Sequence, residues 1–204
     1  MRDQLRAGAA IYNAGHYHAA HDAWEEHWLD LEAETDDERL LHGLIQYTAA
    51  VHHAHEGNWE GAVGLAASAR EYLEAVPPDH HGINLPPIRA FLTALAADPE
   101  CIERQPPVRI EHEGERPTLA TLEFAPTAIA ATVLADELGF DETPVAQART
   151  YAERDLEAGD DDSRFIALLF AFVREEAHRG IIYQRLRDHV GRRRTREADV
   201  DGLF

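Results

Sequence analysis

The amino-acid sequence predicts an all-α protein, in which a helical bundle is followed by a short non-helical connection and a C-terminal helical layer. Three observations predict this fold class. Apolar residues recur every three to four positions along most of the chain, and glycine or proline separates the periodic segments. Two stretches, "YNAGHYHAAHDAWEEHW" and "HEGNWEGAVGLAASAREYL", share an order typical of tetratricopeptide-like helix hairpins: glycine, aromatic residue, small residues, amphipathic helix. Because 45% of the residues are hydrophobic, the chain can form a sizeable core.

The first half of the chain is predicted to form a bundle of helices separated by clear end signals. Gly15 and Gly57 follow periodic segments in the position typical of a helix C-terminus, and Asp36 and Asn58 stand where an N-cap is expected. The stretch "HGLIQYTAAVHH" is apolar on nearly every side, which indicates a central helix. A loop rich in proline and glycine, residues 77–87, precedes the last helix of the bundle. The predicted helices are 2–14, 16–33, 36–56, 59–76 and 87–97.

The second half changes character before it becomes helical again. Apolar residues alternate on both sides of a Glu-Gly-Glu-Arg turn, which predicts a short β-hairpin near 108–124. Further helices are predicted at 126–138, from Thr143-Pro144 onward, and at 164–190 after Asp162 or Ser163. The expected domains are therefore a bundle over 1–97, a linker over 98–125 and a helical region over 126–204.

The charge of the chain indicates which kinds of partner and which cellular compartment to expect. There are 38 acidic residues against 19 basic ones, all of them arginine, and the formal net charge is −19. Such a lysine-free, acidic composition resembles that of cytoplasmic proteins from extreme halophiles, because molar salt shortens the Debye length to about 3 Å and weakens acid–acid repulsion. The negative charge disfavours nucleic acid as a partner, and the basic cluster 192–196 is expected to pair with the protein's own acids or with another protein.

Other features of the composition agree with a cytoplasmic location. No run of about 18 apolar residues is present, so no membrane span is expected. A single cysteine, Cys101, excludes an intrachain disulfide and fits a reducing compartment. A homodimer and a protein partner are both compatible with the aromatic-rich helices.

The segment "HYHAAHDAWEEHW", residues 16–28, carries the first candidate functional residues. At 100° per residue, Tyr17, His21, Trp24 and Trp28 share one helix face, and Glu25 flanks it. His21 and Glu25 stand one helical turn apart, so they could bind one metal ion or share one proton.

A second pair, Gln46 and His53, lies on one face of the predicted central helix. If the second and third helices pack antiparallel, the two pairs could meet. The predicted cluster consists of His21, Glu25, Gln46 and His53, with Tyr17, Trp24 and Trp28 as the pocket wall. Since a buried carboxylate needs a partner, three interpretations follow: a network that only stabilises the bundle, a pocket for a small polar ligand, or a divalent metal site formed by His21, Glu25 and His53.

Several short motifs resemble a known family. The string "HDAWEEHW" at 21–28 is followed by "GLIQ" at 43–46, by His53, and by Gly-Asn and Gly-Ala pairs at 57–58 and 61–62. Together they resemble the family of domains of unknown function numbered 309, over residues of about 5–97. The resemblance implies a compact all-α bundle and supplies no reaction. The chain departs from the family pattern at Asp22, where a glutamate is usual.

Three functions remain compatible with these residues. The leading interpretation is a binding module whose polar pocket takes a small polar ligand or a partner's side chain. The alternatives are a metal-assisted hydrolase that uses the same cluster and a helical interaction scaffold with no small-molecule site, so whether the protein is an enzyme stays open.

His80 and His81 are predicted to lie in a solvated turn, and Glu175 and His178 to form a surface pair.

Overall fold

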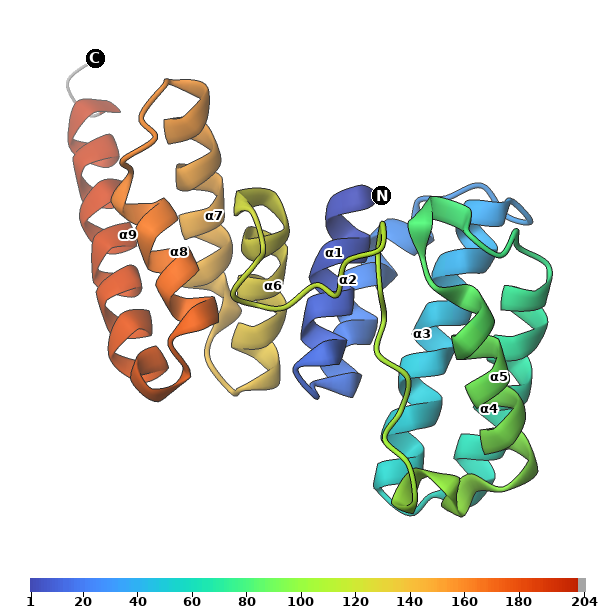
Figure 1. Cartoon of the computed structure of the whole chain (residues 1–204). Helices are drawn as coiled ribbons and strands as arrows, with labels where there is room; N and C mark the ends of the chain where they lie inside the picture. Colours follow the sequence, from blue (N-terminus) through green and yellow to red (C-terminus); the bar gives the residue numbers. More distant parts are fainter. Residues whose placement is uncertain (202–204) are drawn as a thin grey trace. The chain divides into compact units, whose positions relative to one another are not determined.

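The protein consists of two compact helical units in this computed structural model. The structure describes residues 1–201, and the side chains of residues 1–199. The two units are Met1–Leu122 and Glu123–Phe204 (Figure 1). The described residues contain helices and no sheet, which confirms the predicted all-α class. None of the helices in this part of the chain has the length and apolar content needed to cross a membrane.

The first unit is a series of helices in which each packs against the next along the chain. As predicted, Asn58 caps a helix, since its side chain accepts a hydrogen bond from the Gly61 N–H at 3.1 Å. The cap of the central helix is Thr35 rather than Asp36, with the Glu38 N–H donating to the Thr35 hydroxyl at 3.2 Å. The helices are α1 (Arg2–Asn13), α2 (Tyr17–Leu29), α3 (Asp36–His55), α4 (Trp59–Glu74) and α5 (Leu85–Ala97), with 3₁₀ turns η1 (His80–Gly82) and η2 (Pro99–Glu103).

Two helical glycines allow neighbouring helices to approach closely. A Cβ atom added at Gly8 of α1 would lie less than 3.0 Å from three atoms of the Trp24 indole on α2. A Cβ at Gly43 of α3 would lie 2.5 Å from Cδ2 of Leu73 on α4. Trp24 and Leu73 are fully buried. The small residue at each crossing therefore sets the distance between the two helices.

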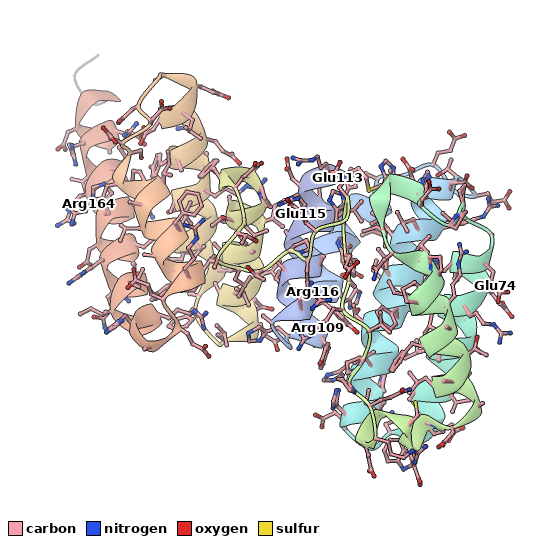
Figure 2. All side chains as sticks on the ribbon, in the orientation of Figure 1. Glu74, Arg109, Glu113, Glu115, Arg116 and Arg164 are labelled. Carbon is pink, nitrogen blue, oxygen red and sulfur yellow. The ribbon has the colours of Figure 1, made fainter. Side chains whose placement is uncertain are left out.

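The predicted β-hairpin at 108–124 is wrong, although its turn is present. Glu113 and Gly114 have φ angles of 54° and 78°, which fit the two-residue turn of a tight hairpin. Only isolated bridges flank the turn, between His112 and Glu115 and between Ile83 and His112. Figure 2 shows Glu113 and Glu115 on this segment, with Arg116 and Arg109 below both of them in the view.

Asparagine side chains replace the missing strand pairing. The Asn13 amide donates to the carbonyl groups of Ile110 and Pro117 at 2.8 and 3.0 Å, and its oxygen accepts from the Ile110 N–H at 3.0 Å. Asn84 acts similarly on Arg109 and Glu111. Backbone groups that a β-ladder would use are thus bonded to side chains of the helical bundle, which explains why alternating apolar residues do not form strands here.

The second unit contains α6 (Phe124–Glu137), α7 (Glu142–Glu157), α8 (Arg164–Arg174), η3 (Glu176–His178) and α9 (Arg179–Asp201). The expected single helix over 164–190 is wrong, because the chain breaks between α8 and α9. The buried Arg179 explains the break: its Nε donates to the Phe172 carbonyl at 2.9 Å, and a terminal nitrogen donates to the Val173 carbonyl at 3.4 Å. These bonds satisfy carbonyl groups at the end of α8.

Charged residues of the second unit pair locally. Arg193, from the predicted basic cluster, contacts Asp155 at 3.3 Å and Glu197 at 3.2 Å. His178 and Glu175 form an exposed pair at 3.9 Å, as predicted. Exposed pairs of this kind contribute little to stability.

Candidate functional site

His21 and Glu25 form the first pair of the predicted cluster, on the outer side of α2. His21 Nε2 lies 3.6 Å from Glu25 Oε1, and His21 Nδ1 lies 3.7 Å from Asp22 Oδ1. The side chains of His21 and Glu25 are 31% and 46% exposed, so this pair is accessible to solvent rather than buried. Asp22, where the family usually has glutamate, lies on the other side of the same imidazole.

Gln46 and His53 bond to other partners. The Gln46 amide nitrogen lies 2.9 Å from Nε2 of His42, and the Asn58 amide nitrogen lies 2.9 Å from Nδ1 of His53. The four predicted residues therefore belong to three different sets of contacts: His21 pairs with Glu25, Gln46 with His42, and His53 with Asn58. The buried four-residue cluster expected from the sequence is not assembled.

The register between α2 and α3 explains this separation. The helices do pack together, with the rings of His18 and His52 5.5 Å apart and those of Trp28 and His42 4.6 Å apart. In the antiparallel register defined by these two contacts, positions 49 and 45 of α3, both apolar, come level with positions 21 and 25 of α2. Helix periodicity alone does not specify this register.

The three aromatic residues predicted as a pocket wall also pack elsewhere. Trp24 is fully buried, and its Nε1 donates to the Gln4 carbonyl of α1 at 2.8 Å. Trp28 donates to Glu38 Oε1 at 2.9 Å, and the Tyr17 ring stacks on His55 with centroids 5.1 Å apart. These contacts belong to the interfaces of α2 with its neighbours.

A row of imidazole rings continues from α2 to α3. The His18 ring lies 6.4 Å from His21 and 5.5 Å from His52, which in turn lies 5.9 Å from His53. His53 is therefore linked to His21 through two intervening rings rather than by direct contact. The histidines provide a nitrogen-rich surface beside the carboxylates of Asp22 and Glu25.

Polar side chains spaced four residues apart along α3 form a ladder that was not predicted from the sequence. His42 lies between Glu38, at 3.3 Å from its Nδ1, and Gln46, at 2.9 Å from its Nε2. The Tyr72 ring of α4 stacks on His42 with centroids 3.9 Å apart. Because Glu38, His42 and Gln46 are spaced four residues apart, the sequence alone could have indicated that they lie on one face of α3.

A second missed group joins α3 to the η1 turn. Nε2 of His80 and Nε2 of His81 lie 2.7 and 2.9 Å from the same oxygen, Oδ1 of Asp37. Partial burial acts to raise the pKa of the Asp37 carboxyl, but the hydrogen bonds from the two imidazoles outweigh it and lower the pKa below its ordinary value. His80 and His81 do lie on a partly exposed turn, as predicted, but their shared partner Asp37 was not predicted, because it lies more than 40 residues away in the sequence.

Two groups among the described side chains have the composition and spacing to hold a metal ion. They are His21, Asp22 and Glu25 on α2, and Asp37, His80 and His81 between α3 and η1; within each group one ligand atom per residue lies within 4.8 Å of the others. His53, expected as a ligand, belongs to neither group.

The fold and these groups define a class: an all-α bundle with clustered imidazole and carboxylate side chains at its surface. Residues 5–65 match the model of a family described as Domain of unknown function (DUF309). The resemblance is thereby confirmed over these residues, which include α2 and α3 but not His80 and His81. The family's description states no activity.

One curated relative is similar over part of the chain. An uncharacterized protein from Aquifex aeolicus (strain VF5) is 29% identical over 96 residues. The match covers 47% of this chain and 28% of the relative. Neither the family nor this relative therefore supplies a function for the protein.

Proposed function

We propose that the first unit is a binding module for a divalent transition-metal ion held by His21, Asp22 and Glu25. The observation that carries this proposal is the approach of the three ligand atoms to within 4.8 Å of one another on one turn of α2. One imidazole and two carboxylates form a mixed nitrogen and oxygen donor set, which suits ions such as zinc and manganese.

The geometry around His21 supports binding rather than a closed hydrogen-bond network. The imidazole lies 3.6 and 3.7 Å from its two carboxylate neighbours, which is beyond hydrogen-bond distance. Since all three side chains are about one-third exposed or more, water or a small ligand can take the remaining coordination positions. The ion would then be the point at which a small anionic ligand attaches.

Metal titration of the full chain, purified without an affinity tag and freed of metal with a chelator, tests the proposal. We expect His21→Ala and Glu25→Gln each to weaken Zn²⁺ binding at this site by about tenfold or more, measured by calorimetry. Glu26→Gln, an exposed acid of the same helix outside the group, is the matched control and should bind as the wild type does. Equal affinity in His21→Ala and the control would contradict the proposal.

A metal-assisted hydrolase is the second candidate, favoured by the open coordination positions at the same centre. Three protein ligands plus one water are typical of catalytic zinc sites. Zinc-loaded protein would then hydrolyse an activated ester faster than free zinc, and His21→Ala would abolish the excess. Binding without this excess rate identifies a binding module.

We also infer that the protein works in the cytoplasm of a salt-rich cell. The inference is supported by 38 acidic residues, 19 arginines and no lysine. Because molar salt screens acid–acid repulsion, we expect the melting temperature to rise with KCl concentration up to the molar range. A melting temperature that is highest in dilute buffer would contradict the inference.

A further inference from the structure

Asp37, His80 and His81 converge on one point from distant parts of the first unit (α3 and the segment between α4 and α5 in Figure 1). Asp37 lies in the first turn of α3, and the two histidines occupy consecutive positions of η1. Both Nε2 atoms lie within 3 Å of the same carboxylate oxygen, at 2.7 and 2.9 Å. The imidazole ring centroids are 4.5 Å apart, with an edge-to-face arrangement and an interplanar angle of 66°.

The backbone places His81 in this position at a conformational cost. His81 has a φ angle of 48° and Gly82 one of 70°, both in the left-handed region. A histidine in this region is uncommon and needs support from its surroundings. Adjacent side chains on a regular strand or helix would not normally point to one atom, whereas with His81 in the left-handed region both rings face Asp37.

The support comes from the segment around 109–113. The Gly82 carbonyl accepts a hydrogen bond from the Glu113 N–H at 2.8 Å. Ile83 is buried and bridges to His112, while Asn84 bonds to the backbone of Arg109 and Glu111. The two imidazoles are thus held on an anchored turn, which is the preorganisation that a ligand site requires.

We propose that Asp37, His80 and His81 form a second divalent transition-metal site, separate from the one on α2. Ligand atoms bound about 2.1 Å from one ion are separated from one another by about 3 Å, which is close to the two spacings in this group. Two neutral imidazoles and one carboxylate form a donor set suited to Fe²⁺, Co²⁺ and Zn²⁺, with further positions open to water or a small ligand.

The accessibility of the group supports metal entry. The side chains of Asp37, His80 and His81 are 40%, 23% and 36% exposed. Metal binding would require each Nε2, which donates to Asp37 in the metal-free protein, to give up its proton; each imidazole would then carry its remaining proton on Nδ1, and the ionised carboxylate would complete the set. The proposal does not depend on the α2 site, since the two groups share no residue. His80 and His81 also lie outside the residues that match the family model.

Metal binding by the full-length His21→Ala variant tests the proposal, because this background removes the α2 site. We expect the metal-free variant to bind one equivalent of Co²⁺, with visible absorption bands typical of nitrogen and oxygen coordination. His80→Ala and Asp37→Asn, added singly to this background, should each weaken Co²⁺ binding by about tenfold or more. Zn²⁺ should displace Co²⁺ and bleach the bands.

Asp36→Asn is the matched control, since Asp36 neighbours Asp37 but contacts Arg39 at 3.6 Å. It should leave Co²⁺ binding unchanged. His81→Ala, at an exposed position, keeps the test decisive if Asp37→Asn fails to fold, as judged by circular dichroism. Absence of Co²⁺ binding by His21→Ala, or binding that is unchanged in His80→Ala and His81→Ala, would overturn the proposal and leave a hydrogen-bonded turn.

The stoichiometry separates this proposal from the proposed function. Wild-type protein should bind two equivalents, and His21→Ala and His80→Ala one each. If the wild type binds one equivalent and His21→Ala binds none, the Asp37 site alone is refuted. If the wild type binds one equivalent and His80→Ala binds none, the α2 site alone is refuted.

Discussion

Replacement of Gly8 by alanine is expected to lower the free energy of unfolding of the first unit by about 3 kcal/mol, as measured by urea denaturation. In an exposed helix the same change would stabilise by about 1 kcal/mol. At Gly8, however, the added methyl group would overlap the Trp24 indole, which is fully buried. Overpacking of this kind costs about 1–3 kcal/mol, and displacement of the ring also breaks the Trp24–Gln4 hydrogen bond.

Gly64→Ala on α4 is the matched control for this prediction. No atom lies within 4 Å of a Cβ built at this exposed position, so the substitution should stabilise by about 0.5–1 kcal/mol. A double-mutant cycle with Trp24→Phe should show that Gly8→Ala costs less when the smaller ring is present. Similar stabilities of Gly8→Ala and Gly64→Ala would mean that α1 and α2 do not cross as described.

Asn13→Ala is expected to have the next largest effect, again about 3 kcal/mol of unfolding free energy. Its amide makes three hydrogen bonds to the backbone of Ile110 and Pro117, both of which are buried. Removal of the side chain leaves these backbone groups without their partner, and each unsatisfied buried group costs about 1–3 kcal/mol. Hydrogen exchange should report the loss locally, as faster exchange of the Ile110 N–H.

Two further variants check the assignment to hydrogen bonding. Asn13→Asp keeps the acceptor for the Ile110 N–H but loses both donors and faces two carbonyl oxygens with a negative charge, so it should be no more stable than Asn13→Ala at pH 7. Asn84→Ala, which removes two bonds of which one is exposed, should cost about 1 kcal/mol. If Asn13→Ala leaves exchange at residue 110 unchanged, the segment is held by other contacts.

Local signals in the sequence predicted most of the helices correctly. The cap at Asn58, the helix-ending glycines at 15 and 57 and the periodic apolar residues are all short-range features, and the structure places helix ends close to them. The errors arise where a distant side chain changes the outcome. Asn13 bonds to backbone that was expected to pair as strands, and Arg179 caps a helix that was expected to continue.

By itself the sequence determined the all-α class, the position of most helices and the resemblance to an uncharacterised family, because periodicity, caps and motifs act within a few residues of the chain. Only the tertiary structure decided which polar side chains meet. The register of α2 against α3 separated Gln46 and His53 from His21, while a left-handed turn brought His80 and His81 to Asp37. Contacts of this kind depend on packing between segments that are far apart in the chain, and no local sequence pattern specifies how those segments pack.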